Sequence, residues 1–276
     1  MLVLTFPGQG SQRPGMGAPW QLHPSWRLVQ ELSEVVGRDI SHLLTDADAQ
    51  ELKATRNAQL ATFALSLVIL DATRAAIELP DAATPVAATA QGPYRVVAFA
   101  GHSLGEYTAL VAAGALSPGQ GAVLVSERGE AMQAAADANP GTMSAIIGLG
   151  PESVAEACAS VEGAWVANDN SPGQVVIAGA HEGVAAASEA ALRLGAKRAI
   201  PLQVGGAFHS PLMRPAQDRL DQAISAAQFE TTASPVIANV DAGGHTSGFA
   251  KLLSAQLCSG VRWRLSMATA AELGGR

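Results

Sequence analysis

Short apolar runs alternate with longer helical patterns along the first part of the chain. Residues 2–6 and 96–100 are apolar runs of strand length, and each stops at a Gly or Pro-Gly turn. Between them, residues 57–79 carry a helical pattern, followed by an Ala-, Pro- and Thr-rich stretch over 80–93 that we expect to form a surface loop. Strands that alternate with helices favour a parallel sheet covered by helices, so we predict an α/β fold.

A different order of elements begins near residue 143. The pattern predicts strand, helix, strand, strand, helix and strand over residues 143–149, 152–160, 164–168, 175–178, 183–194 and 198–204. This β-α-β-β-α-β order is the split βαβ arrangement of a ferredoxin-like unit. Farther along, we expect helices over 211–227, 248–257 and 263–273, and a strand over 235–239.

These patterns predict two domains. Residues 1–136 and 205–276 would form a large domain with a parallel sheet core, and residues 137–204 a small ferredoxin-like subdomain inserted into it. A cleft between two such units is a common place for a ligand.

Composition narrows the class of protein. The chain has 276 residues and a formal charge of −7 from 24 acidic and 17 basic side chains, so we expect no nucleic-acid partner. Its longest apolar run, 60–70, is short of the roughly 20 residues that span a bilayer, and we expect no membrane helix. The first six residues are too short for an export signal, and the two cysteines form no cluster. We therefore expect a cytoplasmic protein without a metal site.

The strongest chemical signal is a GxSxG sequence formed by Gly101, His102, Ser103, Leu104 and Gly105. It follows an apolar strand and precedes a helical segment, which is the context of a nucleophile elbow. The serine hydroxyl would then lie at a helix N-terminus, where backbone N–H groups favour developing negative charge. Ser103 is the predicted nucleophile; the alternative is a serine that only caps the helix.

A nucleophilic serine needs a base, and His209 has the most informative context of the six histidines. Ser210 and Pro211 follow it and resemble the first residues of a helix. The positive end of that helix would disfavour the imidazolium and keep His209 neutral, as a general base requires. His102 is expected to point away from Ser103. A solvent-facing loop position is the alternative for His209.

Arg128 falls on an apolar helix face together with Leu124, Val125 and Met132. A guanidinium on an inward face needs an anion. That anion could be a protein carboxylate such as Glu106, or the carboxylate of a substrate gripped by two hydrogen bonds.

Six motifs in order now point to a family. They are FPGQGSQ at 6–12, GHSLGE at 101–106, ERGEAM at 127–132, NDNSPGQVVIAG at 168–179, GAFHSPLM at 206–213 and QLCSGVRW at 256–263. Together they closely resemble malonyl-CoA:acyl-carrier-protein transacylases and the related acyltransferase domains of polyketide synthases. The resemblance implies an α/β-hydrolase-like large domain with a parallel sheet core plus the inserted ferredoxin-like subdomain.

The resemblance also implies catalytic roles. Ser103 would be acylated, and His209 would act first as its base and then as the acid that protonates the departing thiol. Gln256 matches the glutamine near that histidine, which neutral groups orient in this family. Gln9 and the backbone N–H of Leu104 would form the oxyanion hole.

Other positions match the substrate pocket of the family. Arg128 would clamp the free carboxylate of the malonyl group, and Met132, Asn168 and Asn170 would lie near the bound substrate. Phe208 matches a bulky residue of malonyl-selective relatives, where it would crowd an α-methyl group. We therefore expect malonyl to be preferred over methylmalonyl.

The implied reaction is ping-pong transfer from malonyl-CoA, through malonyl-Ser103, to the phosphopantetheine thiol of acyl carrier protein. No permanently bound cofactor is expected. The partner surface would include exposed basic residues, with the candidates Arg193, Lys197, Arg198 and Arg214. Relatives continue beyond position 276 into a further strand and helix, so the large sheet is expected to lack that strand.

Three alternatives remain open at this point. The first is a serine esterase or thioesterase that uses the same elbow, with Asp169 as the nearest candidate acid for His209. The second is the transacylase subunit of a malonate decarboxylase. The third is a carrier-binding scaffold without catalytic activity.

Overall fold

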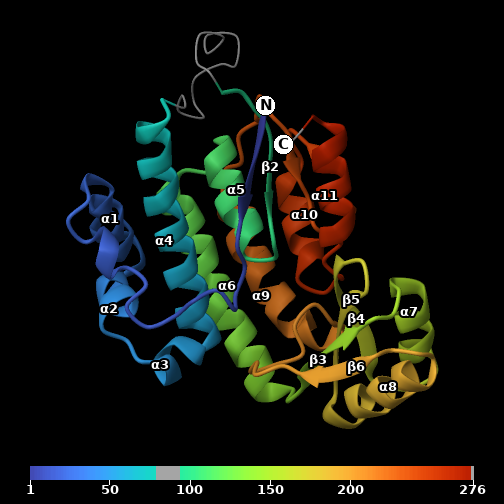
Figure 1. Cartoon of the computed structure of the whole chain (residues 1–276). Helices are drawn as coiled ribbons and strands as arrows, with labels where there is room; N and C mark the ends of the chain where they lie inside the picture. The colour runs from blue at the N-terminus through green and yellow to red at the C-terminus, as the bar shows by residue number, and fades with distance from the viewer. Residues whose placement is uncertain (79–93, 275–276) are drawn as a thin grey trace.

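Two four-stranded sheets organise the molecule (Figure 1). The computed structural model describes residues 1–78 and 94–274. The strands of the large sheet, in spatial order, are β1 (Leu2–Phe6), β2 (Val96–Gly101), β7 (Val236–Ile237) and β8 (Gly244–His245). β1, β2 and β7 are parallel and β8 is antiparallel, so the predicted parallel core is confirmed. The strand expected over 235–239 is shorter than predicted and covers two residues.

Helices cover both faces of the large sheet. Side chains alternate along β2, so that Phe99 joins the main hydrophobic core while Ala98 and Ala100 join a small cluster on the opposite face. Helix α5 (Gly105–Ala113) belongs to the main core, and α11 (Trp263–Glu272) contributes to the opposite cluster. Figure 1 shows α5 and α11 on either side of the strands.

The remaining helices of this part of the molecule are α1 (Arg27–Val36), α2 (Ile40–Thr45), α3 (Ala49–Lys53), α4 (Thr55–Ala76), α6 (Pro118–Ala138), α9 (Arg214–Ala226) and α10 (Phe249–Gln256). Of these helices, α4 and α6 pack against α5, and the others pack mainly on α4, α6 or α9. The helix predicted from residue 211 begins with a 3₁₀ turn over Pro211–Met213 and continues as α9. The expected loop over 80–93 lies outside the described residues.

Helix α4 is long and apolar enough to span a membrane by length and composition alone. However, 67% of the 18-residue apolar stretch within this helix is buried inside the structure. Its contacts with α6 and α5 are those of a core helix, so its apolar surface is already covered by protein.

The second sheet contains β3 (Thr142–Ile147), β4 (Ala164–Ser171), β5 (Gln174–Gly179) and β6 (Arg198–Pro201), in the spatial order β4-β5-β3-β6. All of its pairings are antiparallel. Together with α7 (Pro151–Ala159) and α8 (His181–Arg193) it has the predicted ferredoxin-like order.

The small sheet separates two cores. Ile146, Val175 and Ile177 pack with α7 and α8, whereas Ala145 and Val176 belong to the main core. One face of this sheet therefore docks on the rest of the molecule. The domain boundaries at 136/137 and 204/205 stay a prediction.

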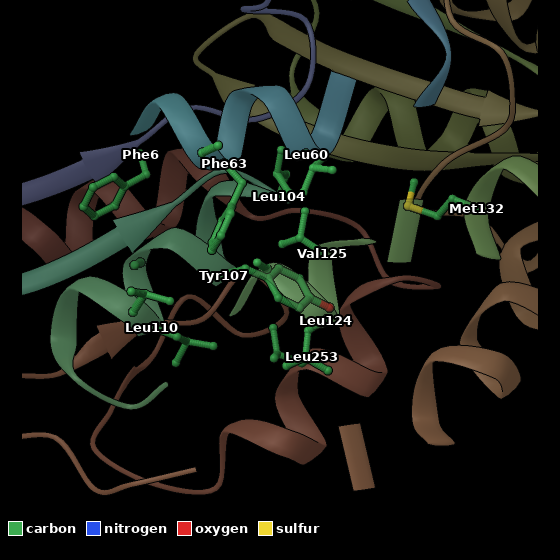
Figure 2. Packing of buried hydrophobic residues seen from close by; sticks show 14 of the residues in the cluster. Phe6, Leu60, Phe63, Leu104, Tyr107, Leu110, Leu124, Val125, Met132 and Leu253 are labelled. Carbon is green, nitrogen blue, oxygen red and sulfur yellow. The ribbon is translucent and has the colours of Figure 1, made fainter. Parts of the chain in front are cut away.

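Tyr107 anchors the helix that follows the predicted nucleophile. It is fully buried, and every residue of α5 is buried with it. Figure 2 shows Tyr107 among apolar side chains that include Leu104 of the preceding turn, Leu124 of α6 and Leu253 of α10. This packing holds the start of α5, and hence the preceding turn, in one position.

Candidate active site

Ser103 occupies a tight turn between β2 and α5. Its φ angle is +52°, in the left-handed region that a residue with a side chain seldom adopts. A Cβ atom on Gly101 would lie 1.9 Å from the carbonyl carbon of Gly105, and one on Gly105 would lie 2.3 Å from the carbonyl oxygen of Phe6. The strained serine and its two flanking glycines thus form the predicted elbow.

His209 lies beside the serine hydroxyl. Its Nε2 is 2.7 Å from the Ser103 Oγ, and its Nδ1 is 3.1 Å from the main-chain carbonyl oxygen of Gln256. This carbonyl can only accept a hydrogen bond, so Nδ1 carries the proton and Nε2 accepts from the hydroxyl. The imidazole is therefore held in the tautomer that a general base needs.

Burial keeps His209 neutral. Burial is the largest effect that lowers the pKa of His209, to about 3, and the Arg128 charge is the next. The segment after His209 begins as a three-residue 3₁₀ turn and continues as α9, and the effect of this helix end on the pKa of His209 stays a prediction. The solvent-facing alternative is wrong, since His209 is only 4% exposed.

Arg128 projects from α6 into this group. It is 1% exposed, and it donates from Nη1 to Gln59 Oε1 at 2.7 Å and from Nη2 to Ser103 Oγ at 2.9 Å. Its guanidinium carbon lies 5.5 Å from the centre of the Tyr107 ring. Within the described part of the chain, no carboxylate is hydrogen-bonded or ion-paired to this guanidinium. The direct Arg128–Glu106 pair considered above is therefore not formed.

Gln256 connects the components of the site. Its Oε1 accepts a hydrogen bond from Arg128 Nη2 at 3.2 Å, and its Nε2 donates to the carbonyl oxygen of Ser103 at 3.0 Å and to Glu106 Oε2 at 2.8 Å. Its contact with His209 is made by the main chain. The side chain thus lies between the guanidinium and the buried carboxyl.

A cavity of about 180 Å³ opens at the serine, at the junction of the small sheet and the large sheet. Its lining includes Ser103, His209 and five further predicted residues, Gln9, Met132, Asn168, Asn170 and Phe208, together with His102, Met143, Val176, Leu202 and Val204. The other predicted residues, Leu104, Arg128 and Gln256, are buried next to this lining and are not part of it. The structure therefore places all ten predicted residues in one region.

Asn239 is a site residue that the sequence pattern did not reveal. Its Oδ1 accepts a hydrogen bond from the Ser103 N–H at 2.6 Å, and its Nδ2 donates to the Gly101 carbonyl at 2.8 Å. Asn239 follows β7, which pairs with β2 in parallel, so the ends of the two strands place it beside the elbow. In the sequence, the signal for this residue is a polar side chain directly after a strand that neighbours the strand leading to the nucleophile.

Two neighbouring contacts test the expectations for His102 and Asp169. His102 turns toward the small sheet, where its Nε2 is 2.9 Å from Asn170 Oδ1. Asp169 is bound by Arg264 at 2.8 Å and not by His209, so it does not serve as the acid of a catalytic triad. Among residues 1–78 and 94–274, no group of three or more His, Cys, Asp or Glu side chains is placed to hold a metal ion.

The fold and the geometry define a class of protein: an α/β enzyme with a serine on a nucleophile elbow and a neutral histidine hydrogen-bonded to it, an arrangement suited to acyl transfer. Comparison with known proteins narrows this class. The family model described as the acyl transferase domain matches residues 3–272. The chain belongs to the malonyl-CoA:acyl-carrier-protein transacylase family, which is related to acyltransferase domains of polyketide synthases.

Relatives named malonyl CoA-acyl carrier protein transacylase match nearly the whole chain. The Bacillus subtilis protein is 41% identical, with 96% of this chain and 81% of the relative covered. The Escherichia coli K12 protein is 38% identical, with 99% and 85% covered.

Solved structures show the same fold. An acyl carrier protein S-malonyltransferase from Vibrio cholerae is 37% identical, covers 99% of this chain and 87% of its own, and has a TM-score of 0.89. A malonyl-transacylase in complex with a type II polyketide synthase acyl-carrier protein is 36% identical, with 99% and 86% covered and a TM-score of 0.89.

Proposed function

We propose that this protein transfers the malonyl group of malonyl-CoA to the phosphopantetheine thiol of an acyl carrier protein. The observation that carries the proposal is the buried guanidinium of Arg128, hydrogen-bonded to the nucleophile and without a carboxylate partner within residues 1–78 and 94–274. A buried cation next to a reactive serine requires an anion, and the free carboxylate of a malonyl group supplies one.

In the first half-reaction, the Ser103 Oγ attacks the thioester carbonyl while its proton moves to His209 Nε2. The 2.7 Å contact between these atoms allows the transfer. The backbone N–H of Leu104 and the side chain of Gln9 would stabilise the oxyanion. The carbon–sulfur bond then breaks, and His209 returns the proton to the sulfur of CoA.

The second half-reaction repeats these steps with the carrier thiol. His209 takes the thiol proton as the sulfur attacks malonyl-Ser103, and it returns that proton to the serine oxygen when the ester bond breaks. Throughout, Arg128 would hold the malonyl carboxylate by two hydrogen bonds. This retention keeps the acyl group oriented until the acceptor arrives.

The hydrolase alternative lacks its expected acid. A carbonyl oxygen of Gln256 accepts the hydrogen bond of His209 Nδ1, and the candidate acid Asp169 is paired with Arg264. The catalytic groups also lie together in one region, which argues against a scaffold without activity. The same site would serve an enzyme of fatty acid synthesis, of polyketide synthesis or of a malonate decarboxylase.

The proposed carrier surface contains four basic residues, Arg193, Lys197, Arg198 and Arg214, whose side chains are exposed. Arg193 is the weakest candidate, because it already pairs with Glu189 at 3.7 Å. Carrier proteins are acidic as a class, so exposed cations on this surface would favour their approach. We further propose that the enzyme acts in the cytoplasm without a permanently bound cofactor.

Incubation of the purified protein with malonyl-CoA, and then with a holo acyl carrier protein, tests this function. Intact-mass analysis should show a malonyl adduct on the protein, and malonyl-carrier protein should form faster than free malonate. Ser103→Ala should abolish the adduct and both products, because the hydroxyl that forms the ester is gone. Faster release of malonate than of malonyl-carrier protein would favour hydrolysis instead.

A further inference from the structure

We propose that Glu106 is a positioning residue that holds the Gln256 amide in one orientation and balances the charge of Arg128 across that amide. Glu106 is buried in α5 and carries no role in the acyl-transfer steps above. Its Oε2 accepts hydrogen bonds from Gln256 Nε2 at 2.8 Å and from the Asn239 N–H at 3.0 Å. The inference rests on the proposed function, since its readout is acylation of Ser103.

The first step of the argument concerns the orientation of the amide. Gln256 Nε2 faces two acceptors, the Glu106 carboxyl and the Ser103 carbonyl, while Oε1 faces the Arg128 donor. In the reversed orientation, three oxygens would meet on one side and two donors on the other. A carboxylate at position 106 strongly disfavours that reversal, and a neutral group there does so less.

The second step concerns charge. The amide dipole of Gln256 lies between a cation and an acid, with its oxygen toward Arg128 and its nitrogen toward Glu106. A direct ion pair would occupy the guanidinium and compete with the substrate carboxylate. The interposed amide lets Glu106 offset the buried positive charge while Arg128 keeps a donor at Ser103.

The third step links Glu106 to the nucleophile through Asn239. Asn239 donates its N–H to Glu106, and its side chain holds both the Ser103 N–H and the Gly101 carbonyl. The same carboxyl oxygen therefore accepts hydrogen bonds from both Gln256 and Asn239. These two residues are in turn hydrogen-bonded to the carbonyl oxygen and the N–H of the strained Ser103. Loss of the Glu106 charge would weaken the positioning of both residues.

The ionisation of Glu106 provides a separate readout. Burial raises the pKa of Glu106 to about 7, while hydrogen bonds from Gln256 and Asn239 and the Arg128 charge act in the opposite direction. Asp241 raises it further, and Tyr107 also faces this group. His209 stays neutral in this range, because its pKa lies near 3.

Glu106→Gln tests the inference, with Thr108→Val as the control. Thr108 lies on the same helix and is buried, and within residues 1–78 and 94–274 its hydroxyl has no hydrogen-bond partner, so the substitution tests a change in the packing of α5 alone. We measure the single-turnover rate of Ser103 acylation by malonyl-CoA from pH 5.5 to 9 by rapid quench and intact-mass analysis.

At pH 8 the rate for Glu106→Gln should fall about tenfold, since small displacements of aligned groups cost factors of this size or more. The wild-type rate should also decline below about pH 7, and this decline should be absent from Glu106→Gln and present in Thr108→Val. Glu106→Asp retains a carboxylate and should keep a pH-dependent decline, which distinguishes loss of charge from general damage to the helix.

Glu106→Gln acylation equal to wild type at pH 8, with the same decline below pH 7, would overturn the role of Glu106. If Glu106→Gln does not fold, a wild-type rate that stays constant from pH 5.5 to 8 would overturn it. A wild-type protein that forms no malonyl adduct would instead refute the proposed function.

Discussion

Replacement of Arg128 by alanine is the most direct test of how the site recognises its acyl group. The guanidinium is 1% exposed and donates to Ser103, Gln59 and Gln256. A hydrogen bond to a charged group contributes about 1.5–3 kcal/mol. Loss of the pair with the malonyl carboxylate should therefore lower kcat/KM for malonyl-CoA by about 10- to 150-fold more than for acetyl-CoA.

The comparison of two substrates separates recognition from damage to the protein. Any loss of folded enzyme, or of the Arg128–Ser103 contact, affects malonyl-CoA and acetyl-CoA alike, so it cancels in the ratio of the two values of kcat/KM. Transfer of each acyl group to the same holo carrier protein, followed by mass spectrometry of the carrier, supplies both values. Arg56→Ala is a matched control, because Arg56 is exposed and pairs with Glu130 at 3.6 Å.

The reasoning is refuted if Arg128→Ala loses activity equally toward both thioesters. That outcome would mean that the guanidinium supports the geometry of Ser103 and Gln256 but does not bind the substrate carboxylate. Arg56→Ala should retain the wild-type ratio, since a surface ion pair contributes little.

Two further predictions concern the pocket and the buried histidine. Wild-type enzyme should turn over malonyl-CoA faster than methylmalonyl-CoA, and Phe208→Ser should narrow this difference, because Phe208 lines the cavity. If competition assays give the same ratio of malonyl to methylmalonyl transfer for Phe208→Ser and wild type, Phe208 does not determine this preference. The pKa of His209 is lowered from 6.5 to about 3, so the unfolded chain binds this proton first and the folded state loses stability as pH falls through that range. The loss should reach about 4 kcal/mol by pH 3. Glu106 acts in the opposite sense between about pH 7 and 4.5, so wild type and His209→Gln are compared by urea unfolding at pH 4.5 and 3.5, where the effect of Glu106 is nearly constant and the other carboxylates titrate alike in both proteins. His209→Gln should lose less stability between these two values, and equal losses would contradict the assignment.

Local patterns were sufficient to predict much of the fold and the positions of the main groups. The strand, turn and helix around Ser103 could be inferred because glycine is required where a Cβ would collide with neighbouring backbone. The inward position of Arg128 followed from helical periodicity alone, and the ferredoxin-like order followed from alternating strand and helix patterns. Each of these features depends on residues that are close in the chain.

The sequence by itself therefore determined the architecture and the identities of the reactive side chains. Only the tertiary structure decided how those side chains are connected: that Gln256 contacts His209 through its carbonyl, that Glu106 meets Arg128 across an amide, and that Asn239 supports the elbow. These hydrogen bonds join residues that are 47 to 150 positions apart in the chain, and no local periodicity encodes the distance between them. For the same reason the low pKa of His209, whose largest cause is burial in the assembled core, could not be derived from the residues beside it in the chain.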